Sequence, residues 1–325
     1  MSRVEIAKEI RKAWSASAPL TATTFLMFGA FIASAAGIFL DDRLITGVPA
    51  WLKPAKFAIS TAIFSGTLAW IFRYISIWPR FVRALGWIVS VVLILEVAII
   101  DAQAARGTTS HFNVGTPLDA TLFGIMGAAI AILWLASAGV FIALCRQKFS
   151  NAAWGWWLRL GMLTTIVGAA AGGLMLRMTP AQIHTLEVTN AIRTAGAHTV
   201  GAPDGGPGLP GTGWSTQHGD LRIPHFFGLH GLQLLPLLGW FMLRRRSVGT
   251  DGNEIRLAFA ATASYFGFIA ILTWQALRGQ SAMAPDSTTL LAFSVWLTAT
   301  ILAGMALMRD ASSPRNAFDP SRRTI

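Results

Sequence analysis

The chain has little charge for its length. Only 13% of its 325 residues are charged and 54% are hydrophobic, whereas soluble domains carry about 25% charged residues. This deficit excludes an ordinary soluble domain. Cysteine is almost absent too: Cys145 stands alone, which excludes an intramolecular disulfide and favours a small apolar filler over a nucleophile. The metal and haem motifs HExxH and CxxCH are both absent.

What the chain has in abundance is long apolar runs. A helix needs roughly 20 apolar residues to cross the hydrocarbon of a bilayer. Eight runs reach about that length, at residues 20–40, 55–78, 82–103, 118–144, 155–177, 224–243, 257–277 and 288–308. We therefore predict an all-α, polytopic integral membrane bundle of about eight transmembrane helices. Residues 1–18 precede the first run as a charged amphipathic segment, and they do not resemble a cleavable signal peptide.

The net charge of +11 is unevenly distributed along the chain. If the N-terminus is cytoplasmic, the cytoplasmic segments hold 18 of the 26 basic residues. This positive-inside pattern predicts cytoplasmic N- and C-termini in a bacterial inner membrane. The expected partner of the basic charge is the lipid bilayer, and nucleic acid is not expected as a partner. The sequence indicates no protein partner.

The chain contains a weak internal duplication. Gln103-Ala-Ala-Arg106-Gly107 ends the third run and Gln275-Ala-Leu-Arg278-Gly279 ends the seventh, 172 residues later. Pro54 and Pro224 open the second and sixth runs, and Pro117 and Pro285 open the fourth and eighth. We interpret these matches as two parallel four-helix halves, residues 19–145 and 146–308. The second half includes a long extracytoplasmic loop at 178–223, and 309–325 form a cytoplasmic tail.

Two spans carry features that predict local geometry. Gly168 and Gly172 lie four residues apart in the fifth span, a spacing typical of a helix-packing face. Pro236 predicts a kink in the sixth span. In the long loop, Thr179-Pro180 predicts a short helix over 181–194, whereas 201–213 are too rich in glycine and proline for a regular element. A loop of that kind is often a lid or a binding loop.

Carboxylates near the outer ends of the spans are candidate proton acceptors. Glu96 lies about five residues inside the third span. A charge at such a depth costs about 2.5–3.5 kcal/mol on insertion scales, so it should face the bundle interior and have a partner. His230 is the partner that we expect. Asp101 is the second candidate for catalytic proton transfer.

Histidines concentrate on the same side of the predicted bundle. The candidate metal ligands are His111, His218, His225 and His230. Neutral imidazoles suit zinc, copper and iron, and carboxylates complete such ligand sets. Candidate contacts to a substrate, an anion or haem propionates are Lys53, Lys56, Gln103, Arg106, Gln275 and Arg278. The alternative interpretation is that the lysines are interfacial anchors and that the two QAxRG segments are ordinary helix C-termini.

Three functions remain open from the residues alone. The first is a membrane oxidoreductase or hydrolase that binds a metal ion or haem, with the cofactor unidentified. The second is a secondary transporter or channel for a small solute, an ion or protons, with Glu96 and His230 as proton carriers. The third is a structural membrane protein without a cofactor, in which the histidines hold the long loop in place.

Overall fold

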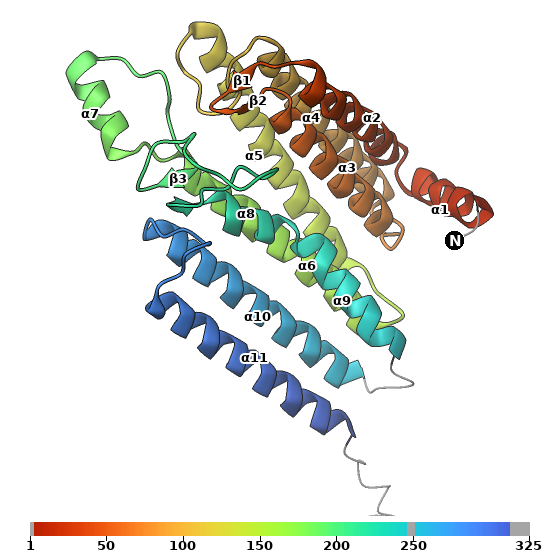
Figure 1. Ribbon diagram of the computed structural model, residues 1–325. Coiled ribbons are helices and arrows are strands. Elements are labelled where there is room, and N and C mark those ends of the chain that lie inside the picture. Colours follow the sequence, from red (N-terminus) through yellow and green to blue (C-terminus); the bar gives the residue numbers. More distant parts are fainter. Residues whose placement is uncertain (1–2, 246–250, 313–325) are drawn as a thin grey trace, which may run out of the picture.

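The computed structural model describes residues 3–245 and 251–312 and shows an all-α bundle. Its long helices lie side by side, with α7 and the short strands at one end, here called the loop face, and α1 at the opposite end, the α1 face (Figure 1). The part before the midpoint comprises α1 (Arg3–Ala16), α2 (Ala18–Leu40), β1 (Leu44–Ile45), β2 (Val48–Pro49), α3 (Leu52–Phe72), α4 (Pro79–Ala105) and α5 (Pro117–Arg146). Prolines in the first turns of α2, α4 and α5 help to fix where these helices begin.

The remaining elements repeat this up-and-down course. They are α6 (Ala152–Ala171), the 3-10 turn η1 (Gly172–Leu176), α7 (Pro180–Thr189), β3 (Thr199–Val200), β4 (Gly219–Asp220), α8 (Arg222–Leu229), α9 (Gly231–Arg245), α10 (Asp251–Leu277) and α11 (Ser287–Ser312). The strands form two antiparallel pairs, β1 with β2 and β3 with β4. Of the predicted cytoplasmic tail, residues 313–325 lie outside the described part of the chain.

Within the described residues, seven helices are long and apolar enough to cross a membrane, and α8 with α9 forms an eighth, bent span. The bend of 45° lies between Leu229 and Gly231, so it precedes Pro236, where the sequence predicted a kink. Pro236 instead lies inside α9, and its ring faces Gly161 of α6. Both parts of this span, α8 and α9, pack against α6.

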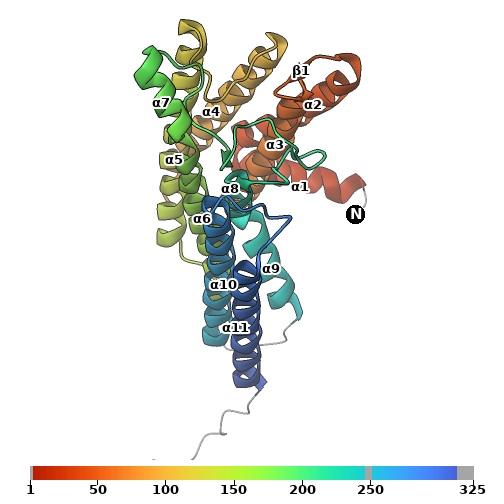
Figure 2. The ribbon, with the colours of Figure 1, turned by 60° about the vertical axis from the view of Figure 1, so that its left-hand side comes forward.

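The two sets of four spans pack in the same order. In the first set α2 packs on α3, α3 on α4, and α4 on α5, and α2 also contacts α4. In the second set α6 packs on α8 and α9, these pack on α10, and α10 packs on α11, while α6 also contacts α10. Helix α11 lies against α10 at the margin of the bundle (Figure 2). The two sets join through α5 and α6, and one core cluster unites Leu68, Val140, Leu158, Met162 and Leu232.

Glycines bring α6 unusually close to α8, as the spacing of Gly168 and Gly172 predicts. A Cβ on Gly168 would lie 2.3 Å from the Cα of Gly228, and one on Gly228 would lie 2.4 Å from the Cα of Gly168. One turn further along α6, Gly172 leaves room for the ring of His225. The backbones therefore contact each other directly, and no side chain larger than hydrogen fits between them.

The long loop is partly regular. Helix α7 begins with a capping box formed by Thr179 and Gln182. It ends at Thr189, before the expected residue 194, because Asn190 takes a left-handed conformation with φ 53°. Residues 201–213 contain no helix and no paired strand, as their composition predicts.

The contact between α6 and α8 predicts a strong effect of a very small substitution. Gly168→Ala should force the two backbones apart and destabilise the protein by about 1–3 kcal/mol, the usual range for overpacking. Thermal unfolding in detergent measures the effect. Gly124→Ala in α5 is the control, because a Cβ there meets no atom within 4 Å. Equal melting temperatures of the two variants would contradict the packing described for α6 and α8.

Candidate functional site

Three charged or titratable side chains meet at the loop face of the first four spans. Lys53 comes from the first turn of α3, Glu96 from the outer part of α4, and His111 from the loop between α4 and α5. Phe112 has a left-handed backbone with φ 61° and is buried, so the chain turns sharply beside His111. The set of these three residues is called the Lys53–His111–Glu96 cluster below.

His111 lies between the other two members of the cluster. Lys53 Nζ is 3.0 Å from His111 Nδ1, and His111 Nε2 is 3.6 Å from Glu96 Oε1. A lysine ammonium has donors only, so it donates to Nδ1, which then carries the ring's lone pair. The imidazole proton is therefore assigned to Nε2, the atom that faces Glu96.

The carboxyl of Glu96 is buried without a hydrogen-bond partner. Its exposed fraction is 4%, and neither carboxyl oxygen has a hydrogen-bond partner within residues 3–245 and 251–312. Buried polar groups are nearly always paired, so such an exception calls for an explanation. The charge of Lys53 acts on this carboxyl. Glu96 thus lies 3.6 Å from an imidazole nitrogen and within the electrostatic influence of Lys53.

The surroundings of His111 keep its imidazole neutral. Burial lowers the pKa of His111 well below 6.5, and the charge of Lys53 lowers it further. The ring also contacts Phe57, with 5.5 Å between the ring centroids. A neutral ring with its proton directed at Glu96 has the form that a proton relay requires.

His198 and Asp204 lie close to the cluster, although the sequence did not mark either as a site residue. The His198 ring packs edge-on to Phe112 at 4.9 Å between centroids, and its Nδ1 is 2.6 Å from Asp204 Oδ2. Burial lowers the pKa of His198 despite this carboxylate. The pair belongs to an irregular Gly/Pro-rich loop, where no periodicity could have indicated it.

Basic side chains at the beginnings of α3 and α8 donate hydrogen bonds to the Gly/Pro-rich loop. Lys56 Nζ donates to the carbonyl of Thr212 at 2.7 Å. Arg222 donates to the carbonyl of Gly213 at 2.6 Å and pairs with the buried Asp220 at 2.5 Å. The predicted contact residue Lys56 therefore binds the chain's own loop in this conformation.

The hydrogen bonds of the other predicted ligands, His218, His225 and His230, join them to groups outside the cluster. His225 Nδ1 lies 2.8 Å from the carbonyl oxygen of Gly168, and His230 Nδ1 lies 3.1 Å from Gln233 Oε1. His218 forms a backbone bridge to Gln280. The described residues contain no group of three or more His, Cys, Asp or Glu side chains arranged to hold a metal ion. The expected pairing of Glu96 with His230 stays a prediction, because the neighbour that the structure gives Glu96 is His111.

Asp101, the second predicted proton acceptor, lies five residues after Glu96 on α4. Its Oδ1 atom is buried and has no hydrogen-bond partner. It shares this property with Glu96, but no ionisable neighbour accompanies it among the described contacts.

The two QAxRG segments make matching hydrogen bonds. Gln103 Nε2 donates to the carbonyl of Thr109, and Gln275 Nε2 donates to that of Ser281, 172 residues later. Gly107 and Gly279 both take positive φ, 74° and 72°. Arg106 pairs with Asp119 in the first turn of α5, and Arg278 pairs with Asp286 at the start of α11. Through these contacts, the four predicted residues stabilise the connections between consecutive helices. They are Gln103, Arg106, Gln275 and Arg278.

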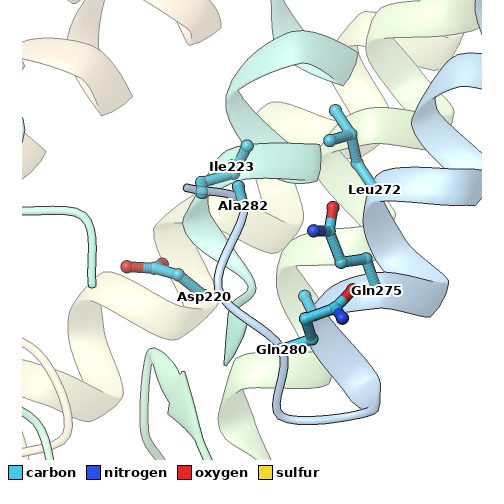
Figure 3. A pocket seen from close by; sticks show the side chains of 7 residues that line it. Asp220, Ile223, Leu272, Gln275, Gln280 and Ala282 are labelled. Atoms are coloured by element: carbon cyan, nitrogen blue, oxygen red, sulfur yellow. The ribbon is translucent and has the colours of Figure 1, made fainter. Parts of the chain in front are cut away.

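A small hollow lies beside the second QAxRG segment. It is lined by Asp220, Ile223, Leu272, Gln275 and Gln280, with the two glutamines on α10 and the turn that follows it (Figure 3). Its wall thus combines two amide groups with the carboxylate of Asp220 and apolar side chains.

Comparison with protein-family models found no match, and comparisons with curated proteins and with solved structures found none either.

The position of the imidazole proton predicts a distinctive titration. Because folded His111 takes up a proton only well below pH 6.5, its nitrogen NMR signals should show the neutral Nε2–H form at pH 6. The unfolded chain binds that proton more readily, so this residue makes folding less favourable as the pH falls below about 6.5. Lys53→Met removes a repelling charge and should raise the pKa of His111. A wild-type His111 that is half protonated at pH 6.5 would contradict the assignment.

Proposed function

We propose that this multi-pass membrane protein is a proton-linked secondary transporter for a small solute, with the Lys53–His111–Glu96 cluster as its proton-exchange site on the extracytoplasmic side. One observation carries the proposal: a carboxyl inside a membrane span has no hydrogen-bond partner and is approached by a neutral imidazole at 3.6 Å. Intramembrane carboxyls of this kind are typical of proton pathways.

The cluster supports a balanced proton transfer. His111 Nδ1 takes a proton from the Lys53 ammonium while Nε2 releases its own proton to the Glu96 carboxylate. The products are a neutral amine, an imidazole protonated on Nδ1, and a carboxylic acid. Water at the loop face then returns a proton to Lys53. The gap of 3.6 Å between Nε2 and Oε1 must shorten by a few tenths of an ångström for the second transfer.

The corresponding positions of the second half support a single site. At the 170-residue spacing of Pro54 and Pro224, Lys53 corresponds to Ile223. At the 172-residue spacing of the two QAxRG segments, Glu96 corresponds to Phe268 and His111 to Met283. All three counterparts are apolar, although the prolines, the QAxRG residues and their hydrogen bonds recur. We interpret this as a duplicated scaffold in which the second half lacks these three ionisable groups and has His225 and His230 in its own broken span. Packing alone does not account for these groups, since the second half packs in the same order without them.

The broken span supports movement between the halves. His230 lies at the 45° bend between α8 and α9 and contacts Gln233. Gln233 Nε2 donates to Thr67 Oγ1 of α3 at 3.2 Å, so a polar link joins the two sets of spans close to the bend. Interrupted helices at the interface between repeats are a common feature of secondary transporters.

A metal-dependent hydrolase or oxidoreductase is the second candidate, and the same distance favours it. Two ligands that each lie about 2.0–2.2 Å from one zinc ion are separated by roughly 3.3–3.6 Å, and His111 Nε2 and Glu96 Oε1 are 3.6 Å apart. A metal ion held there would need further ligands from water, substrate or His198. Its chemistry would be activation of a bound water or of a substrate carbonyl.

Proton flux into liposomes that contain the purified protein and an internal pH-sensitive dye tests the proposal. An imposed membrane potential should drive proton entry faster than in protein-free liposomes. Glu96→Gln should lower that flux about 100-fold or more, the usual contribution of a positioned acid–base group. Glu187→Gln is the matched control, because Glu187 is exposed on α7.

Metal analysis of the same preparations separates the two candidates. Wild-type flux equal to that of protein-free liposomes would overturn proton-linked transport. Stoichiometric zinc, iron, copper or manganese that is lost in both His111→Ala and Glu96→Gln would then establish the metal site. Flux that is unchanged by Glu96→Gln would remove Glu96 from the proton pathway.

A further inference from the structure

A groove lies at the α1 face, at the other end of α3 from Lys53. It has a volume of about 270 Å³ and is walled by α1, α2 and α3. Ile6, Ile10, Phe25 and Trp70 contribute apolar surface, and Gly66 of α3 also lines the groove, where an added Cβ would lie 3.3 Å from Thr24 Cγ2. Helix α1 joins α2 directly through Ser17, so the groove lies where the amphipathic helix meets the first two spans.

The hydroxyl groups of the groove are occupied within the protein. Thr21 Oγ1 donates to the carbonyl of Ser17, and Thr24 Oγ1 donates to that of Leu20. Thr24 and Ser65 also share a hydrogen bond of 3.0 Å. Both threonine hydroxyls are therefore engaged within the protein, and the rest of the wall is mostly apolar, which suits a hydrocarbon chain better than a polar ligand.

The mouth of the groove carries net positive charge. Glu9 lies between two cations, with its carboxylate oxygens 2.7 Å from Lys12 Nζ and 2.6 Å from an Arg73 nitrogen. The hydrogen bonds from Lys12 and Arg73 lower the pKa of Glu9, so the three side chains together carry one positive charge. Lys8 and Arg11 are exposed on the same helix.

The exposed side of α1 is that of a membrane-surface helix. Val4, Ile6, Ile10 and Trp14 are all exposed, with exposed fractions of 38–74%. A helix with such residues beside basic ones lies in the interface of a bilayer and is attracted to anionic lipid. The groove therefore opens at the depth where phospholipid headgroups meet their acyl chains.

We propose that this groove holds one anionic phospholipid of the leaflet at the α1 face, with an acyl chain between α1 and the α2–α3 pair and its phosphate beside Lys12 and Arg73. The site is independent of the proton-exchange cluster, which is at the other end of the bundle. A bound lipid would fix α1 on the first two spans by filling the space between them.

Native mass spectrometry of the protein released from bilayers of phosphatidylglycerol and phosphatidylethanolamine tests the site. The wild type should retain one phosphatidylglycerol in preference to phosphatidylethanolamine. Gly66→Leu fills the groove and should abolish that retention, whereas Gly29→Leu, on an open surface of α2, should not. Ala13→Leu fills the same groove from α1 and is the second variant if Gly66→Leu does not fold. Lys12→Gln should reduce retention about fivefold, as expected for one basic residue at a lipid surface.

Either of two outcomes would decide against the proposal. Equal retention by Gly66→Leu and Gly29→Leu, or by Ala13→Leu and Gly29→Leu, would show that the lipid binds elsewhere. Equal retention of the two lipids by the wild type would leave an acyl-chain contact without headgroup recognition, and would overturn the anionic site. A preparation that retains the lipid but shows no proton flux would contradict the proposed transport and would still support the lipid site.

Discussion

The burial of one carboxyl inside a membrane span is the constraint on which this account depends. Glu96 is 4% exposed and has no hydrogen-bond partner in the part of the chain that the structure describes, in surroundings where an unpaired charge is costly. The imidazole of His111 lies beside this carboxyl, and the ammonium of Lys53 contacts the other nitrogen of the same ring. Three features of the surrounding structure hold these groups in place. They are the first turn of α3, the sharp turn at Phe112, and the loop to which Lys56 and Arg222 form hydrogen bonds.

Contacts at the helix connections match between the two sets of four spans, whereas the buried carboxyl has an aromatic residue at the matching spacing. Arg106 and Arg278 each tie the end of one helix to the start of the next through a carboxylate. In the second half, Phe268 takes the place of Glu96 and packs against Phe227, Phe293 and Trp296. An aromatic cluster of that kind is stabilising without any ionisable group. This difference between the two sets of spans supports the function that we propose for the ionisable groups of the first.

The sequence predicted the fold well and the site only in part. The eight spans, the helix starts at proline and the close packing at Gly168 follow from length, backbone chemistry and residue size. The sequence favoured His230 as the partner of Glu96, and that pairing stays a prediction. The structure shows His111 at 3.6 Å from Glu96, a contact that the sequence did not indicate because it depends on the rotation of α4 and on the course of the loop after it. His198 and Asp204 were not predicted, since an irregular loop has no periodic pattern to show which side chains turn inward.

A double-mutant cycle between Lys53 and Glu96 tests the central claim most directly. Unfolding free energies in detergent would be measured for wild type, Glu96→Gln, Lys53→Met and the double variant. If the two groups stabilise each other across His111, each single variant leaves a partly buried charge without compensation. The double variant should then lose less stability than the two single changes combined, by about 1–3 kcal/mol. Additive effects within about 0.5 kcal/mol would show that the three residues do not act as one site.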